Sequence, residues 1–394
     1  MTKAVRSWPK NMEDKLAMDG KIIPDIFDDA QAAAFLKAYC EKGFLHIEQE
    51  DRTRFEHLFT WDAINKLLSL NLLDAKRMRV VKDGRDVPLA FYRRDDENKT
   101  IDPRKLAALM EQGGSIAINA VQQFSEGVSR LAAQFERWLN QRLNVNMYLS
   151  FGTGGAFTSH FDTHDVLALQ IHGEKLWTIY EDPEPYPRHE LKTSGRHAAR
   201  GRKVLCNPFL RAGDLIYFPR GFYHEAAVQD GFSVHMTFGL RTAVGMHFVD
   251  DIRRKCLETD LFRMDVHEMS GPQALAEQEQ ALKAELHRIV DSYSLTEMLE
   301  ARKQKRQPID QFQLGPKPDL NQSTVLVPRL RHSDVAALPR KVAEETTNKV
   351  VSRLIENKRM TFSELTDSFG DEYTVDDLRT AVKKLFDEHL LECI

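Results

Sequence analysis

The chain has few cysteines for its length, and they are scattered. Cys40, Cys206, Cys256 and Cys393 are the four among 394 residues, and no two of them form a C-x-x-C pair. Structural zinc sites and the disulfide frameworks of secreted proteins place cysteines at close, regular spacings. The pattern argues against both and favours a reducing compartment, so we expect a cytoplasmic protein.

Long hydrophobic runs and a strong charge of one sign are also missing. Residues 1–16 are polar without an apolar core, and no later segment approaches the length of a membrane span, so we expect no membrane association. The net charge of -4 argues against a chain that coats nucleic acid. An apolar content of 42% with 29% charged residues is ordinary for a globular protein, and the length allows two or three domains.

The strongest chemical signal is an H-x-D pair, His160 and Asp162, followed some sixty residues later by His224. Residues two apart on a β-strand point to the same side, so the imidazole and the carboxylate share a face while Phe161 points to the other. A second strand of the same barrel can bring His224 beside them. Two histidines and one carboxylate form the facial triad that holds Fe(II) and leaves three positions open for chemistry.

The surrounding segments support a barrel. Residues 213–224 read as a turn glycine, an apolar strand, a proline-glycine stop and then the histidine, with the intervals of the second metal motif of cupin barrels. Residues 165–177 look like the strand-turn-strand that follows H-x-D in JmjC-type oxygenases, with Gly173 at the turn and Lys175 on the returning strand. Alternating strands are also expected to start at Asn146 and to cover 233–238.

Together with residues 35–47, these segments resemble the bacterial JmjC-domain ribosomal oxygenases. The resemblance is dense in motifs from about 146 to 238 and holds in domain order over nearly the whole chain. It implies a mixed α+β protein built on a double-stranded β-helix, the cupin or JmjC jelly-roll barrel. It further implies Fe(II), the cosubstrate 2-oxoglutarate and dioxygen, and hydroxylation at a β-carbon of an arginine or histidine in a protein substrate, a ribosomal one.

The resemblance also assigns roles to individual residues. The iron ligands, which are the catalytic residues, fall on His160, Asp162 and His224. The 2-oxoglutarate contacts fall on Lys175, which should pair with the distal carboxylate, and on Tyr148 and Ser233, while Asn146 aligns with a residue near the substrate.

Each assignment has a plainer alternative. An H-x-D pair can be a surface hydrogen-bonding pair, Lys175 a solvated strand lysine and Tyr148 a barrel aromatic. Three further histidines compete for the ligand set, and for all of them we expect hydrogen-bonded polar roles instead: His164, His172 and His235.

The rest of the chain is expected to be mostly helical. A long helical pattern covers part of 103–143, and helix returns between 248 and 305, where 276–290 is rich in helix formers and Ser294 is placed to cap the next helix. We therefore expect a catalytic domain with a helical N-terminal extension at 1–245, a helical dimerisation module like that of the family at 246–306, a proline-punctuated linker at 307–339 and a winged-helix-like domain at 340–394.

The final domain is expected to contact protein and not DNA. Helices over 341–356, from Thr361 and from Thr374, followed by a strand at 390–394, make a winged helix plausible. Its third helix opens with Asp376 and Asp377, which phosphates would repel.

Other functions stay open at this stage. A basic stretch at 188–203 could steer an acidic or RNA-bound partner, or be a solvated loop. The chain could also be a 2-oxoglutarate oxygenase acting on another peptide or a small molecule, a cupin isomerase, a dioxygenase without cosubstrate, or a non-enzymatic cupin and winged-helix regulator. Of these alternatives, only a 2-oxoglutarate oxygenase would need Lys175.

Overall fold

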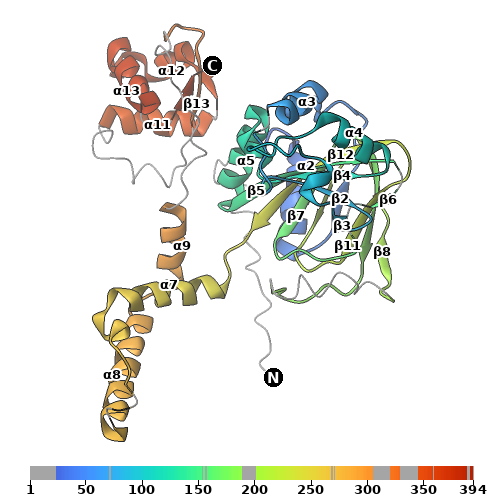
Figure 1. The fold of residues 1–394 in the computed structure, drawn as a ribbon. Helices are drawn as coiled ribbons and strands as arrows, with labels where there is room; N and C mark the ends of the chain where they lie inside the picture. Colours follow the sequence, from blue (N-terminus) through green and yellow to red (C-terminus); the bar gives the residue numbers. More distant parts are fainter. Residues whose placement is uncertain are drawn as a thin grey trace. The chain divides into compact units, whose positions relative to one another are not determined.

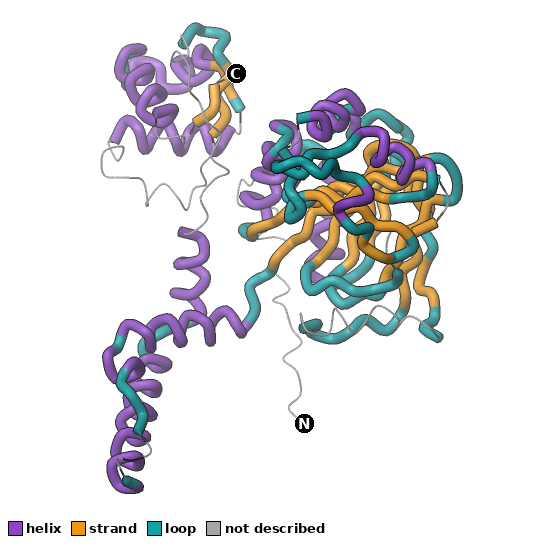
Figure 2. Tube along the Cα trace, viewed as in Figure 1, coloured by secondary structure: helices purple, strands orange, loops and turns teal. Residues whose placement is uncertain are grey.

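The computed structural model describes residues 24–70, 72–152, 154–155, 158–188, 201–267, 269, 271–304, 320–328, 345–357, 359–387 and 391–393. The chain divides into two compact units, 1–240 with 308–394, and 241–307. Figures 1 and 2 show that strands gather in the first part of the chain and that helices dominate the rest. Among the described residues, no helix combines the length and the apolar character that a membrane span needs.

The described residues between Leu45 and Arg241 contain a twelve-stranded antiparallel sheet whose central strand is the long strand β7. Along the main path the strand order is β1-β10-β7-β12-β5-β4-β2-β3, and β8, β9 and β11 pair with the far half of β7. The strands are β1 (Leu45–Ile47), β2 (Met78–Lys82), β3 (Arg85–Asp86), β4 (Ser115–Ile118), β5 (Arg142–Phe151), β6 (Gly154–Gly155), β7 (Asp165–Tyr180), β8 (Val204–Cys206), β9 (Phe209–Arg211), β10 (Leu215–Phe218), β11 (His224–Val228) and β12 (Phe232–Arg241).

The expected strand-turn-strand at 165–177 is wrong in one respect, because β7 runs through it without a turn. Gly173 has a φ of +63°, and a Cβ at this position would lie 2.0 Å from the Phe232 carbonyl oxygen. Only glycine tolerates both the left-handed backbone and this close approach. The glycine therefore marks a kink at which β7 stops pairing with β12 and β10 and begins to pair with β9 and β11.

Four helices cover the sheet: α2 (Asp29–Glu41), α3 (Trp61–Ser69), α4 (Pro103–Glu111) and α5 (Glu126–Leu139). Aromatic side chains join α2 and α5 to the barrel, where Phe35 stacks on Trp138 and also meets the edge of Tyr217 on β10. The long helical pattern expected within 103–143 is confirmed in α5, which buries Val128, Leu131 and Phe135, while Val121 lies in a short 3-10 helix before it. A separate helix, α4, precedes it, and β4 lies between the two. Gly113 adopts a φ of +84° directly after α4, which ends the helix.

The unit at 241–307 is helical, as the sequence predicts. It contains α7 (Gly245–Glu258), α8 (Pro272–Asp291) and α9 (Leu295–Gln304). Ser294 accepts a hydrogen bond from the Glu297 backbone N–H at 3.1 Å, and Glu297 accepts one in return from the Ser294 N–H at 2.7 Å. The predicted cap at Ser294 is therefore confirmed.

The C-terminal residues have a hydrophobic core of their own. Three helices, α11 (Glu345–Asn357), α12 (Phe362–Phe369) and α13 (Val375–Asp387), pack with a three-stranded antiparallel sheet of order β14-β13-β15, formed by β14 (Met360–Thr361), β13 (Val325–Pro328) and β15 (Leu391–Cys393). Thr361 caps α12 with a reciprocal hydrogen bond to Glu364, as predicted. Most of the expected linker at 307–339 and all of 1–16 lie outside the described residues.

Candidate metal centre

The backbone brings the H-x-D segment against the start of β11. His160 and His224 exchange two hydrogen bonds, from His160 N to His224 O at 3.0 Å and from His224 N to His160 O at 2.8 Å, and the Gly221 N–H donates to the Asp162 carbonyl at 2.9 Å. The H-x-D residues do not form the regular strand that we expected, since His160 makes only an isolated bridge. The predicted alternation still holds, because Phe161 is buried against the Tyr223 ring while its two neighbours are half-buried.

The three predicted ligands lie together. One ligand atom from each of His160, Asp162 and His224 lies within 4.8 Å of the other two. The His224 Nε2 is 3.7 Å from an Asp162 carboxylate oxygen, and the two imidazole centroids are 4.5 Å apart. His224 is buried, whereas His160 and Asp162 are partly open, which leaves a side from which further ligands can approach.

Hydrogen bonds fix both imidazoles in one tautomer. The His160 Nδ1 lies 2.9 Å from the Thr158 carbonyl oxygen, and the His224 Nδ1 lies 3.0 Å from the Phe222 carbonyl oxygen. A carbonyl only accepts, so each Nδ1 donates the hydrogen bond and Nε2 is the nitrogen left for a ligand bond. Two imidazole nitrogens and one carboxylate oxygen are a donor set that suits a divalent iron.

Aromatic side chains form a dry wall behind His224. The Phe218 ring lies 4.6 Å from the His224 ring, and Trp177 of β7 stacks on it at 6.1 Å with an interplanar angle of 24°. Both rings are buried. They hold the imidazole and exclude water from its inner side.

Lys175 is a buried amine whose charge no described carboxylate balances. Its side chain is 2% exposed, and its Nζ donates a hydrogen bond of 3.0 Å to the Ser150 hydroxyl, which in turn accepts one from Ser115. Burial lowers the pKa of Lys175 to about 7. An anion beside this amine would restore its charge, and Lys175 lies on the same side of β7 as Trp177, which contacts His224.

The other predicted site residues follow β5 and β12. Burial, followed by the charge of Asp162, raises the pKa of Tyr148 to about 12, while a hydrogen bond with Asn146 opposes the shift. The Tyr148 ring stacks on His235 of β12 at 5.0 Å. Ser233 is fully buried, and its hydroxyl accepts a hydrogen bond of 2.8 Å from Gln170.

The three competing histidines stay outside the cluster of ligands within the described residues. His172 lies 3.0 Å from the Phe59 carbonyl oxygen, and the His164 Nδ1 lies 3.2 Å from the Asp165 carbonyl oxygen, as expected for polar histidines. His235 differs from that expectation, because its buried Nδ1 has no hydrogen-bond partner in the described part of the chain. Burial and then the charge of Lys175 hold the pKa of His235 well below its usual value, so the ring is neutral.

One buried residue near the centre was missed from the sequence. Asp165 is fully buried and accepts hydrogen bonds from the Lys42 amine at 2.6 Å, the Tyr217 hydroxyl at 2.9 Å and the Arg220 backbone N–H at 3.0 Å. It thus ties the segment after the H-x-D pair to the segment before His224. An acidic residue at the start of an apolar run was the signal in the sequence that could have pointed to it. Its side-chain partners, Lys42 and Tyr217, are distant in sequence, so the local pattern does not predict them.

The basic stretch at 188–203 is described only at its ends, at Arg188 and from Gly201 onward. The Arg202 guanidinium lies 4.0 Å from the centroid of the Tyr223 ring. Tyr223 directly precedes His224 in the sequence. Lys203 pairs with Glu181 at 3.0 Å.

Comparisons with known proteins agree on one family. Residues 118–247 match the JmjC domain. The chain is 30% identical to ribosomal oxygenase 1 of Rattus norvegicus over 212 residues, which are 52% of this chain and 34% of that protein. It is 25% identical to the bifunctional lysine-specific demethylase and histidyl-hydroxylase NO66 of Dictyostelium discoideum over 235 residues, 55% of this chain and 41% of that protein. The chain thus spans well under half the length of these curated relatives.

A solved structure shows the same fold. The crystal structure of the Escherichia coli ribosomal oxygenase YcfD superposes with a TM-score of 0.51 at 16% identity, over 92% of this chain and 97% of that one. The mixed helix and sheet architecture with a large antiparallel sheet is therefore the JmjC, cupin-like fold. Residues 118–247 therefore match the JmjC domain, and the chain is similar to ribosomal oxygenases in sequence and in fold.

Proposed function

We propose that this protein is a 2-oxoglutarate-dependent oxygenase that uses Fe(II) to hydroxylate an arginine or histidine side chain, at its β-carbon, in a ribosomal protein. One observation carries the proposal: a cluster of two histidines and a carboxylate lies in the same barrel as a buried amine with no described carboxylate partner. The first fits a divalent iron and the second fits a dicarboxylate cosubstrate. Neither an isomerase nor a regulator needs both.

The residues of the chain divide the work between them. His160, Asp162 and His224 would hold the iron, and the carbonyl partners of the two histidines keep their rings oriented. Iron and 2-oxoglutarate together would supply the activation of dioxygen that hydroxylation of a C–H bond requires.

Lys175 would bind the far carboxylate of the cosubstrate by a charge-assisted hydrogen bond, in a pocket from which Trp177 excludes water. We propose Tyr148 and Ser233 as further cosubstrate contacts. Asn146, half-buried two residues before Tyr148 on β5, would lie near the substrate.

The names of two relatives support a protein substrate. One is a ribosomal oxygenase and the other is a lysine-specific demethylase and histidyl-hydroxylase. A ribosomal protein in the cytoplasm is therefore the proposed partner, and the scattered cysteines of the sequence fit that reducing compartment.

The test measures both the substrate and the chemistry. In a strain that lacks this protein, intact-mass analysis should show one ribosomal protein lighter by one oxygen atom, and the wild-type gene should restore the mass while Asp162→Ala should not. Identical masses in all three strains would count against a ribosomal substrate. Purified protein should also release succinate from 2-oxoglutarate only when Fe(II) is present. If no succinate forms with any candidate peptide, the proposed oxygenase activity is refuted.

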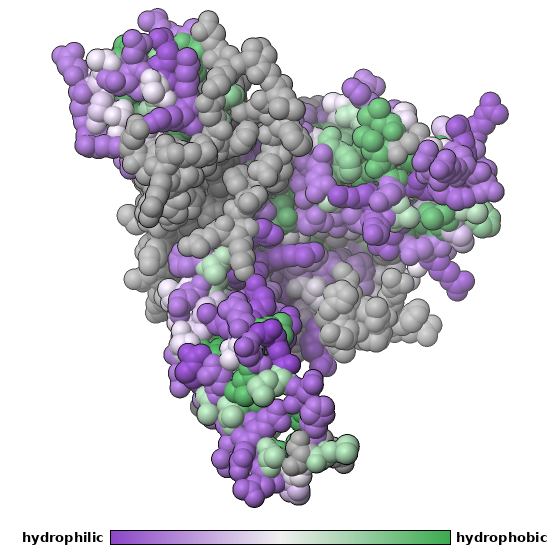
Figure 3. All heavy atoms as spheres, turned by 60° about the vertical axis from the view of Figure 1, so that its left-hand side comes forward, coloured by the Kyte–Doolittle hydropathy of each residue, from purple (hydrophilic) through white to green (hydrophobic). Residues whose placement is uncertain are grey.

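We further propose that residues 246–306 form a dimerisation module. Figure 3 shows apolar side chains among the hydrophilic ones on this helical unit, in the lower part of the view. Its exposed large apolar residues are Met246, Val249, Leu257, Met264, Val266, Met269, Leu286, Val290, Leu295 and Leu299. Apolar surface of this extent favours burial against a second copy. The full chain should sediment as a dimer, and a monomer at micromolar concentration would contradict the module.

For the C-terminal residues we propose a winged helix. The expected domain at 340–394 would extend back to include Leu320 and β13, which fall within the expected linker at 307–339, and the catalytic domain would cover 1–245. Three helices and a three-stranded antiparallel sheet support that fold. Asp376 and Asp377 in the first turn of α13 disfavour phosphate, so the domain would contact protein and not DNA.

A further inference from the structure

A cavity lies on the opposite side of β5 from the candidate metal centre. Tyr148 and Ser150 of this strand face His235 and Lys175, and the residues between and after them, Leu149 and Phe151, therefore face the other way. They form one wall of a cavity of about 550 Å³. The strand separates the two sites, so a ligand here would not touch the proposed iron ligands.

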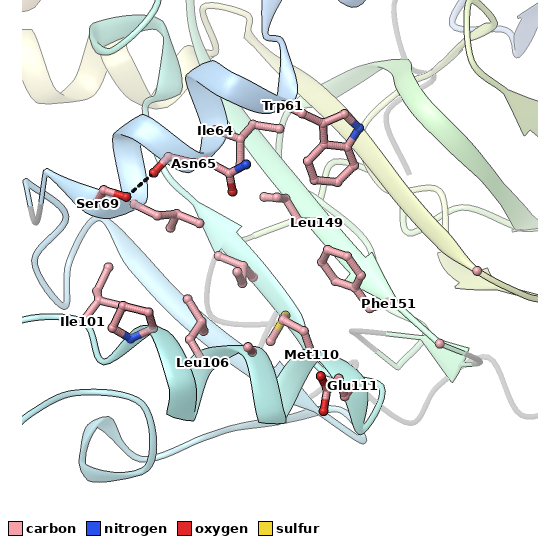
Figure 4. Close-up of a pocket in the computed structure, with 16 residues that line it drawn as sticks. Trp61, Ile64, Asn65, Ser69, Ile101, Leu106, Met110, Glu111, Leu149 and Phe151 are labelled. Atoms are coloured by element: carbon pink, nitrogen blue, oxygen red, sulfur yellow. Dashed lines mark hydrogen bonds between the residues drawn. The ribbon is translucent and has the colours of Figure 1, made fainter.

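Two helices close the cavity from either side. Figure 4 shows Trp61 and Ile64 of α3 facing Leu106 and Met110 of α4 across it, with Leu149 between them. Trp61 is fixed from behind, since it stacks on His172 at 5.3 Å and meets the edge of Phe232 at 5.4 Å. The wall is therefore preformed.

The cavity is partly open to solvent, so it is a surface pocket and not a void in the core. Cavities of roughly 300–1,000 Å³ lined mainly by apolar side chains are characteristic of small-molecule sites. At about 550 Å³, with apolar residues from two helices and two strands around it, this cavity belongs to that class.

The charges around the cavity indicate which polar group a ligand would carry. Of the described residues that line it, none is basic, and Glu111 at the end of α4 is the one with a charge. Asn65 and Ser69 of α3 add side-chain polar groups at the rim, with the Ser69 hydroxyl donating to the Asn65 carbonyl at 2.7 Å. A carboxylate or phosphate ligand would meet Glu111 without a compensating cation, whereas an amine would be attracted to it.

We propose that this cavity binds a small apolar molecule whose polar end is a cation or a hydrogen-bond donor, such as an aliphatic amine. The apolar body lies between Trp61 and Met110 against β5, and the polar end lies at Glu111. The site is separate from the proposed oxygenase centre.

The experiment uses three probes with the same decyl chain: decyltrimethylammonium, decanol and decanoate. Titration calorimetry on the full-length protein below micellar concentrations should give the tightest binding for the ammonium and the weakest for decanoate. Glu111→Gln should remove the advantage of the ammonium over decanol, about two- to fivefold for a partly exposed charge. Absence of binding by all three probes, or tightest binding by decanoate, would overturn the proposal.

A matched pair of variants on one helix locates the site. Ala107 lines the cavity and Ala108, its exposed neighbour on α4, does not, so tryptophan at the first position fills the cavity and at the second adds only surface. Ala107→Trp should weaken ammonium binding at least about tenfold, while Ala108→Trp should leave it unchanged. Equal affinity in both would refute the site. In the wild type, the ammonium should slow amide exchange in α3 and α4, and unchanged exchange there would refute it independently.

Discussion

The buried amine of Lys175 predicts an unusual result for Lys175→Met. In the ligand-free protein the folded state buries an amine without a carboxylate partner among the described residues, and burial lowers its pKa from 10.5 to about 7. Methionine has a similar length, fills the same volume and has no charge to desolvate. The variant should therefore be more stable than the wild type without ligand, although it removes a residue of the proposed cosubstrate site.

The magnitude follows from proton linkage. Between pH 7 and pH 10.5 the unfolded chain holds a proton on Lys175 that the folded chain releases, so the free energy of unfolding rises with pH by about 1.4 kcal/mol per unit in this window. Below pH 7 the folded and the unfolded chain both hold the proton, so the folded state bears the full cost of burying the charged amine. At pH 8 the burial costs about 3 kcal/mol, and the lost hydrogen bond to Ser150 offsets about 1 kcal/mol of the gain on substitution.

Denaturant unfolding of the wild type and of Lys175→Met at pH 7.5 and pH 9.5 measures this effect. The variant should be more stable by about 3 kcal/mol at the lower pH, and the difference should shrink to under about 1 kcal/mol at the higher pH. Lys66→Met, a change at an exposed lysine of α3, serves as the control and should alter neither value.

Ligand gives the second readout. 2-Oxoglutarate should raise the melting temperature of the wild type and leave that of Lys175→Met unchanged, since the carboxylate has lost its partner. A variant that is less stable than the wild type without ligand, shows the same pH slope and is still stabilised by 2-oxoglutarate would refute the reasoning.

Three further changes test the architecture. Asp165→Asn leaves the Lys42 amine without its buried charge partner and should destabilise the barrel by about 3 kcal/mol in denaturant unfolding, with weaker Mn(II) binding by calorimetry. Gly173→Ala should destabilise by at least about 2 kcal/mol, because its Cβ would meet the Phe232 backbone, whereas Gly231→Ala, also at positive φ but in open space, should cost about 1 kcal/mol in the same assay. His160→Ala should abolish Mn(II) binding in the same calorimetry, and full occupancy in that variant would contradict its role as a ligand.

The metal cluster could be predicted from the sequence because its signals are local. Alternation over three residues decides that His160 and Asp162 share a side, and this survives even though the segment makes only a bridge. The proline and glycine before His224 mark the end of β10, and Gly221 takes the positive φ that the turn needs. Short-range periodicity and turn residues therefore sufficed.

The kink in β7 could not be predicted in the same way. A glycine between two apolar runs is compatible with a turn or with a continuous strand, and its own residues do not decide between them. The decision comes from Phe232, whose carbonyl oxygen occupies the space where a side chain at Gly173 would lie. That neighbour is distant in sequence, as are the partners of Asp165, so the pattern of one segment contains neither.

The long strand explains why the proposed anion site at Lys175 and the candidate metal centre lie in one barrel. β7 pairs with β10 and β12 before Gly173 and with β9 and β11 after it, so its second half is fixed to the strand that begins at His224. Lys175 and Trp177 both lie in that half, and Trp177 contacts the His224 ring directly. The distance from amine to metal centre is therefore set by two rigid ladders and not by a loop. A dicarboxylate that binds at both sites must match this fixed distance between the amine and the metal ligands. The barrel would therefore favour one cosubstrate over shorter or longer acids.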